Sequence, residues 1–128
     1  MRVVDTSAWI EWAQSSALGE ALAPQLPGND AWIVPTMVQY ELARWLVRER
    51  SVEEASRLLA FTTELVVIPL TTDIATKAAL FAARHKLAMA DAIIYATAMD
   101  SGADLLTCDA HFAALPSVVY HQKGALDG

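Results

Sequence analysis

The chain of 128 residues has a single cysteine, Cys108, so it contains no internal disulfide. This cysteine usage is compatible with a reducing compartment. No positively charged segment leads into a long apolar stretch at the start, as it would in a signal peptide. No apolar run approaches the roughly 20 residues that span a membrane. We therefore expect a cytoplasmic protein without a membrane-spanning segment.

Positive charge is scarce. Nine Lys and Arg residues against 15 Asp and Glu residues leave a formal net charge of −6. A protein that binds nucleic acid through a broad basic surface usually has the opposite sign. Contact with nucleic acid would thus need metal ions or a local arginine cluster to offset the carboxylates. Arg44, Arg48 and Arg50 are candidates for such a cluster, although arginines near helix ends are more often only solvated.

Metal-binding residues of the zinc type are also few. Beside the one cysteine there are three scattered histidines with no ligand-spaced pair, which disfavours a zinc site. We interpret His85 as a residue that complements a helix dipole and His111 as a turn residue, and neither as a ligand.

Apolar residues are plentiful, at 55% of the chain against about 45–50% in ordinary globular proteins. The excess indicates either a partner or dimer face, or an alanine-rich helical core. Trp12 and Trp45 are the better candidates for contact with a partner. The length suits one domain over residues 1–128, with a loose tail from about residue 121.

Short apolar runs alternate with segments of helical periodicity. The predicted strands and helices are strands 3–4, 31–34, 66–68, 103–107 and 117–120, and helices 7–23, 37–50, 51–65, 73–85 and 90–101. This alternation predicts an α/β fold, with a central, mostly parallel sheet of four to five strands flanked by helices on both faces. Thr6, Thr36 and Ser51 are predicted to cap helices, and Ser15–Ser16 is a point at which the first helix can break.

Four acids occupy positions that suggest a common site. Asp5 ends the first strand, and Asp109 comes just after an apolar strand. Asp91 lies in the first turn of a nearly all-apolar helix, and Glu41 lies about one turn into its helix. Strand carboxyl ends and helix N-termini share one edge of a parallel sheet, so the four can converge. Each alone also has a plain explanation, as a cap, a turn residue or a solvated side chain.

Converging carboxylates repel one another unless a cation lies between them. Oxygen ligands favour Mg²⁺, with Mn²⁺ as the alternative. An ion held by a few carboxylates lowers the pKa of bound water and neutralises charge at phosphorus, so such a site suits phosphodiester hydrolysis.

Four segments of the chain together resemble a PIN domain, and among PIN domains they most resemble the VapC-type toxins of bacterial toxin–antitoxin pairs. No segment is specific alone, but together they cover residues 1 to about 119 in the expected order. The segments are VVDTSAWI at 3–10, PTMVQYEL at 35–42, ADAIIYATA at 90–98 and LLTCDAHF at 105–112.

The resemblance implies a Mg²⁺-dependent endoribonuclease, the toxic component of a type II toxin–antitoxin system. Its acidic positions fall on Asp5, Glu41, Asp91 and Asp109. Asp5 and Asp91 would be the firmest metal ligands, and Asp109 would help with the same or a second ion. Glu41 would orient metal-bound water or join the coordination indirectly.

The resemblance also implies supporting residues and partners. Ser7 and Thr107 match hydroxyl positions beside the acids, where they would hold carboxylates in place. The partners would be an RNA substrate, a cognate antitoxin that covers the cleft, and a second copy of the chain in a homodimer, which could extend to a dimer of toxin–antitoxin pairs.

Three alternatives remain at this point. A PIN-like domain without catalytic activity could serve only as a binding module, although all four acids are present. A phospho-accepting receiver domain would need an acid pair after its first strand, and only Asp5 is there. A haloacid dehalogenase-type hydrolase would need a second Asp two residues after the first, where Ser7 stands.

Overall fold

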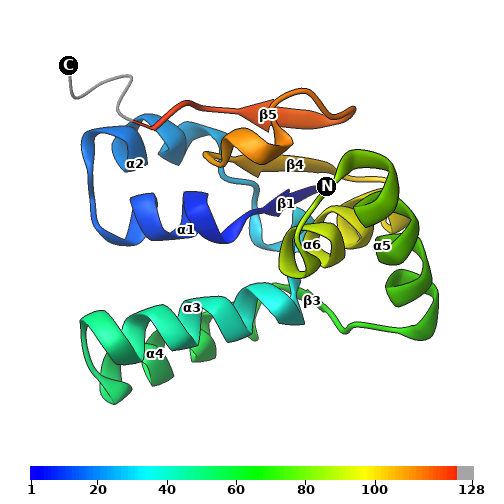
Figure 1. Ribbon diagram of the computed structural model, residues 1–128. Coiled ribbons are helices and arrows are strands. Elements are labelled where there is room, and N and C mark those ends of the chain that lie inside the picture. The colour runs from blue at the N-terminus through cyan, green and yellow to red at the C-terminus, as the bar shows by residue number, and fades with distance from the viewer. Residues whose placement is uncertain (124–128) are drawn as a thin grey trace.

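The computed structural model, which describes residues 1–123, is built on one five-stranded sheet of order β3-β2-β1-β4-β5 (Figure 1). Every pair of neighbouring strands is parallel. The strands are β1 Arg2–Val4, β2 Trp32–Pro35, β3 Val66–Ile68, β4 Asp104–Thr107 and β5 Val118–Tyr120. The predicted α/β fold is confirmed, and the sheet is wholly rather than mostly parallel.

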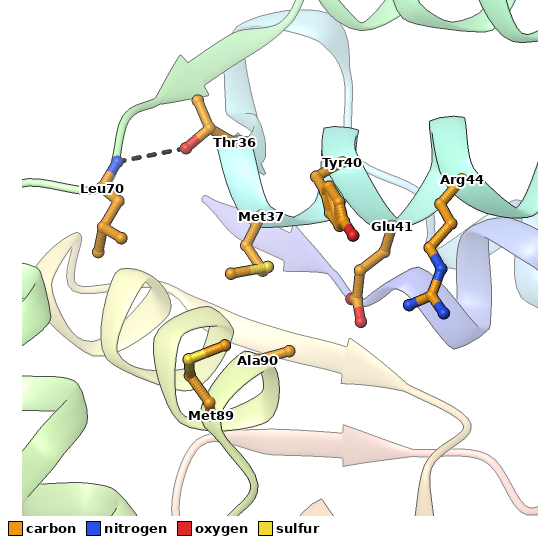
Figure 2. Close-up of a pocket in the computed structure, with 8 residues that line it drawn as sticks. All are labelled: Thr36, Met37, Tyr40, Glu41, Arg44, Leu70, Met89 and Ala90. Atoms are coloured by element: carbon orange, nitrogen blue, oxygen red, sulfur yellow. Dashed lines mark hydrogen bonds between the residues drawn. The ribbon is translucent and has the colours of Figure 1, made fainter.

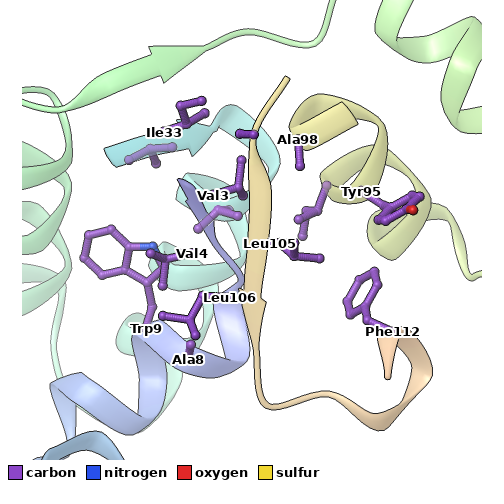
Figure 3. Packing of buried hydrophobic residues seen from close by; sticks show 14 of the residues in the cluster. Val3, Val4, Ala8, Trp9, Ile33, Tyr95, Ala98, Leu105, Leu106 and Phe112 are labelled. Carbon is purple, nitrogen blue, oxygen red and sulfur yellow. The ribbon is translucent and has the colours of Figure 1, made fainter. Parts of the chain in front are cut away.

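Helices cover both faces of this sheet. The pair Val3–Val4 in central β1 is fully buried, as expected for a strand that faces helices on both sides. In Figure 3, Ala8 and Trp9 lie on one side of the sheet, and Tyr95 and Ala98 lie on the other. The helices are α1 Thr6–Ala13, α2 Ala17–Leu22, α3 Thr36–Glu49, α4 Val52–Thr62, α5 Thr72–His85 and α6 Met89–Asp100.

The predicted helix 7–23 is two helices. Ser15 adopts a left-handed conformation with φ of 51°, which ends α1 and turns the chain back on itself. Ser16 then caps α2 by accepting a hydrogen bond from the Gly19 N–H at 2.9 Å. The break therefore falls at the Ser15–Ser16 pair, where the sequence allowed it.

Of the predicted helix caps, one is confirmed and two are wrong. Ser51 accepts a hydrogen bond from the backbone at the start of α4. Thr6 instead donates its hydroxyl to Glu41 Oε1 at 2.7 Å, and Thr36 accepts from the Leu70 N–H at 3.3 Å. Both threonines lie inside the first turn of their helices, where partners from other segments compete with the backbone for the hydroxyl.

An aromatic cluster joins the α3–α4 pair to the sheet. The rings of Trp9 and Trp32 lie 4.7 Å apart between centroids, and both residues are buried. Half-buried Trp12 and Phe61 pack edge-on or tilted against them. Two of the four tryptophans are thus core residues.

At His121, close to where the loose tail is predicted to begin, the chain still follows the sheet. The His121 N–H donates to the Thr107 carbonyl at 2.9 Å, which extends the pairing of β4 with β5. The His121 Nε2 atom also lies 2.8 Å from Gln25 Nε2. The rest of the predicted tail from residue 124 lies outside the described residues. Within residues 1–123, no helix has the length and apolar character to cross a bilayer.

Candidate metal centre

The carboxyl edge of the sheet brings the predicted acids together. Asp5 follows β1 directly, and its N–H donates to the Leu106 carbonyl at 2.8 Å, so the pairing of β1 with β4 continues past the end of β1. Asp109 follows β4 by two residues, and Asp91 lies in the first turn of α6. This is the edge at which ligands collect in parallel α/β sheets.

Asp5 is the buried member of the site, with 3% of its surface exposed. Both Ser7 Oγ, at 2.7 Å, and Thr107 Oγ1, at 2.9 Å, donate hydrogen bonds to its Oδ2 atom. Burial raises the pKa of Asp5 more than these two bonds lower it, and the charges of Asp109 and Glu41 raise it further. No lysine or arginine among residues 1–123 forms an ion pair with Asp5. The charged carboxylate therefore favours a cation.

The two hydroxyls are themselves fixed by the backbone that follows β4. Ser7 Oγ accepts from the Cys108 N–H at 3.0 Å, and Thr107 Oγ1 accepts from the Asp109 N–H at 2.9 Å. With their acceptor sides occupied, both hydroxyls point their hydrogens at Asp5. Ser7 and Thr107 thus lie in hydrogen-bond contact with the carboxylate of Asp5.

Asp91, Asp109 and His111 form a set of possible metal ligands, because one ligand atom of each lies within 4.8 Å of the others. The His111 Nδ1 atom is 3.1 Å from Asp109 Oδ1 and 3.8 Å from Asp91 Oδ2. Burial, together with the charges of Asp109, Asp5 and Glu41, raises the pKa of Asp91 to about 6. The surroundings of Asp91 therefore oppose its ionisation, and a bound cation would favour it.

The sequence interpretation missed the contribution of His111 to this group. His111 does lie in a turn, the 3₁₀ segment Ala110–Phe112, where Asp109 accepts a hydrogen bond from its N–H at 2.9 Å. That same turn brings the imidazole beside both carboxylates. The available signal was the Asp-Ala-His spacing directly after a strand, which places an acid and a histidine at one sheet edge.

Glu41 is contributed by α3, whereas the other three acids follow β1 and β4 or lie at the start of α6. The Thr6 hydroxyl holds its Oε1 atom, and its charge raises the pKa of both Asp5 and Asp91. All four predicted acids therefore act on one another electrostatically at one edge of the sheet.

The arginines of α3 divide by their position. Arg44 lines two hollows together with Glu41, and Arg48 lines the second of these. Arg48 also pairs with its exposed neighbour Glu49 at 2.9 Å. Arg50 lines neither hollow. Of the three arginines, Arg44 is therefore the best placed to contact a phosphate at this site (Figure 2).

Buried Cys108 lies between two residues of the site. Burial raises the pKa of its thiol to about 11, and the charges of Glu11 and Asp5 contribute to that shift. A thiol of this kind stays protonated at neutral pH, so it supplies neither a nucleophile nor a soft metal ligand.

The sequence profile of the PIN domain matches residues 2–118 of the chain. The chain therefore belongs to the PIN domain family, and the resemblance drawn from its four segments is confirmed. Membership of the PIN domain family excludes the receiver-domain and haloacid dehalogenase alternatives. A comparison with curated protein sequences gives no significant match.

Solved structures agree with this fold. A toxin–antitoxin complex from Klebsiella pneumoniae matches with a TM-score of 0.78 and 22% identity, over 93% of this chain and 96% of that one. The Mycobacterium tuberculosis toxin VapC20, described as cleaving the sarcin–ricin loop, matches with a TM-score of 0.76 and 22% identity, over 92% and 97%. VapBC2 from Rickettsia felis, bound to a promoter DNA fragment, matches with a TM-score of 0.72 and 16% identity, over 94% and 97%.

Proposed function

We propose that this PIN domain is a Mg²⁺-dependent endoribonuclease and the toxin of a type II toxin–antitoxin pair. The observation that supports it most is the convergence of Asp5, Glu41, Asp91 and Asp109 on one edge of the sheet. Burial and the neighbouring carboxylates raise the pKa of Asp5 and of Asp91, and Asp5 has no cationic side chain as partner among residues 1–123. Such a group is most stable around a divalent cation.

The donor set fits a hard cation. Asp5, Asp91 and Asp109 would hold Mg²⁺, and Mn²⁺ would suit the same oxygen atoms. When bound, the ion lowers the pKa of its water and neutralises charge on the scissile phosphate. His111 stands at the exposed side of the group, where its imidazole can contact the ion or a substrate phosphate.

Three hydroxyl residues orient the carboxylates of Asp5 and Glu41 by hydrogen bonds. Ser7 and Thr107 favour the ionised form of Asp5 and fix its direction, because both donate to its Oδ2 atom. Thr6 occupies the Oε1 atom of Glu41, so the Oε2 atom of Glu41 is the one that can accept a proton or hydrogen bond from an attacking water.

The biological role is proposed from the solved structures that share this fold. Structures similar to this chain are described as toxin–antitoxin complexes, in part bound to DNA. We accordingly propose an RNA substrate, a cognate antitoxin protein that covers the acidic site, a homodimer and action in the cytoplasm.

The test is RNA cleavage with and without the acids. The purified chain should cleave RNA in Mg²⁺ or Mn²⁺ and not in EDTA, and its expression should arrest growth. Asp5→Asn and Asp91→Asn should abolish both effects. Asp73→Asn is the matched control, because Asp73 occupies the first turn of α5 as Asp91 does in α6 but is exposed. Full cleavage by both site variants would overturn the assignment.

A catalytically silent binding module is the second candidate. It would bind RNA or an antitoxin with wild-type acids present but would cleave no RNA in either metal. Purified protein that binds without cleaving, at matched concentrations of Mg²⁺ and Mn²⁺, would favour this candidate over the nuclease.

A further inference from the structure

A hollow of about 490 Å³ opens directly beside the acidic site. It lies between α3 and the start of α6, and Figure 2 shows Met37, Tyr40 and Glu41 extending from α3 toward Met89 and Ala90. Ala90 precedes the predicted ligand Asp91 in the chain. One wall of the hollow is thus continuous with the acids.

The end of the hollow away from the acids is apolar and open to solvent. Tyr40, Leu70 and Met89 are 56%, 46% and 74% exposed, although all three are large apolar or aromatic residues. Met37 lines the same end. Tyr40 carries an exposed aromatic ring beside Met37 on α3, and the face of such a ring can accept a flat apolar ligand.

The other end of the same face carries positive charge. A second hollow of about 220 Å³ lies along α3 and shares Glu41 and Arg44 with the first. Trp45 and Arg48 line it as well. The guanidinium of Arg44 has no hydrogen-bond or ion-pair partner among residues 1–123.

Helical spacing explains why these side chains line one groove. Positions 37, 40, 41, 44, 45 and 48 follow the three- and four-residue steps that put side chains on one face of an α-helix. The face therefore runs from an apolar, aromatic end, past the carboxylate of Glu41, to two arginines. We call the two hollows together the α3 groove.

We propose that the α3 groove binds single-stranded RNA, with an unpaired base stacked on Tyr40 and the backbone phosphate held by Arg44 and Arg48. The inference rests on the proposed nuclease function and adds the form of its substrate. Stacking on an aromatic side chain requires a base that is free of its pairing partner, which a single strand or loop offers and a duplex does not.

Charge and continuity favour this occupant. The chain has a net charge of −6, so a nucleic acid needs a local cationic contact, and Arg44 is an unpaired one beside the acids. A strand that passes from the apolar hollow to the cationic hollow must cross Glu41, because Glu41 lines both. Its phosphate backbone then lies against the proposed metal centre.

The test measures binding apart from cleavage. Each variant is made in the Asp91→Asn background with Mg²⁺ present, and the dissociation constant of a short fluorescein-labelled single-stranded RNA is measured by anisotropy. Tyr40→Ala should weaken binding about five- to tenfold, because a stacked base contributes an effect of this order, while Tyr40→Phe should change it less than about twofold. All three residues at this position are compatible with an exposed helix site, and circular dichroism verifies folding.

Arg44→Gln should weaken binding about fivefold and lower the slope of affinity against salt by about 0.7, as expected for one lost phosphate contact on a single strand. Arg50→Gln is the matched control, since Arg50 is an exposed arginine just after the same helix that lines neither hollow. It should change affinity less than about twofold. An RNA with one abasic position should bind the parent protein, which has Tyr40, more weakly than the intact RNA does. In Tyr40→Ala the two RNAs should bind equally.

The outcomes separate this inference from the proposed function. If wild-type protein cleaves RNA but Tyr40→Ala and Arg44→Gln bind RNA as tightly as the parent, the groove proposal is overturned and the nuclease assignment stands. If a perfect RNA duplex binds as tightly as the single strand, the stacking proposal is also overturned. If the variants lose only an antitoxin protein that copurifies with the chain, the groove is a protein-binding surface. If wild-type protein neither binds nor cleaves RNA, both proposals fail.

Discussion

Thr107 Oγ1 donates a hydrogen bond of 2.9 Å to Asp5 Oδ2, across 102 positions of sequence. Neighbouring strands β1 and β4 bring the two residues together, and Ser7 adds a second hydroxyl to the same oxygen atom. A single carboxylate oxygen thus receives both hydroxyl hydrogens, and the Oδ1 atom of Asp5 has no hydrogen-bond partner among residues 1–123.

Removing either hydroxyl should weaken metal binding. Ser7→Ala or Thr107→Val deletes one donor to Asp5, so the pKa of Asp5 rises further and its charged form becomes less populated. We expect Mn²⁺ affinity, measured by isothermal titration calorimetry, to fall about tenfold or more for each variant. The exposed helical residue Thr76 provides the control Thr76→Val, which should leave Mn²⁺ affinity unchanged.

The raised pKa of Asp91 makes the metal-free protein sensitive to pH. The group titrates at an ordinary value of 3.8 in the unfolded chain and at about 6 in the folded one. Between these values the folded state keeps a proton that the unfolded state has lost. The free energy of unfolding therefore falls as pH rises from about 4 to about 6.

Asp91→Asn removes this titration without changing the shape of the side chain. We expect the variant to be more stable than the natural chain at neutral pH in EDTA, by on the order of 1–2 kcal/mol after allowance for solvent screening. The advantage should shrink as the pH falls and vanish below about pH 3.8, where Asp91 is protonated in the folded and the unfolded chain alike. Urea denaturation at both pH values measures it, and equal stability at neutral pH would contradict the assignment of the charge cluster.

His111 should matter more for borderline metal ions than for Mg²⁺. Its Nδ1 atom lies among the oxygens of Asp91 and Asp109, and imidazole favours Ni²⁺ whereas carboxylates favour Mg²⁺. His111→Ala should weaken Ni²⁺ binding about tenfold and Mg²⁺ binding less than about twofold. His85→Ala serves as the control, since His85 stacks on Phe81 away from the acids. An unchanged Ni²⁺ affinity in His111→Ala would show that the imidazole is no ligand.

Gly19 is required by the close approach of α2 to the end of α1. A Cβ atom at this position would lie 2.1 Å from the Glu11 carbonyl oxygen, which is backbone and cannot move aside cheaply. Gly19→Ala should lower the free energy of unfolding by about 2 kcal/mol or more. Gly28→Ala is the matched control, because a Cβ there meets nothing within 4 Å, and it should change stability by less than about 1 kcal/mol in chemical denaturation.

The fold was predictable wherever periodicity and strand ends decide structure. Apolar runs located the strands, and the rule that strand ends and helix starts share an edge brought Asp5, Asp91 and Asp109 together before any contact was known. The strand order was not predictable, because parallel pairing depends on packing between segments far apart in sequence. β1 lies between β2 and β4, and no local pattern states that.

Details of the site escaped for a related reason. Thr6 is a residue type that often caps helices, but its hydroxyl donates to the Glu41 carboxylate on α3. Only the folded chain shows which partner the hydroxyl bonds. His111 is interpreted from the sequence as a turn residue, and it does lie in a turn. The turn also places its imidazole beside the carboxylate of Asp109. Tyr40 belongs to a segment noted for Glu41, but its exposure depends on how α6 packs.

The position of β1 in the middle of the sheet has a consequence for synthesis. Its partner β4 begins at Asp104, so a nascent chain that has not yet emerged past that point lacks Thr107, Asp109 and the second strand that pins Asp5. A partly made chain therefore has Asp5, Glu41 and Asp91 without the group that closes the site around them. A chain that ends before Asp104 lacks these groups, so the order of the strands delays assembly of the acidic site until the last fifth of the chain is present.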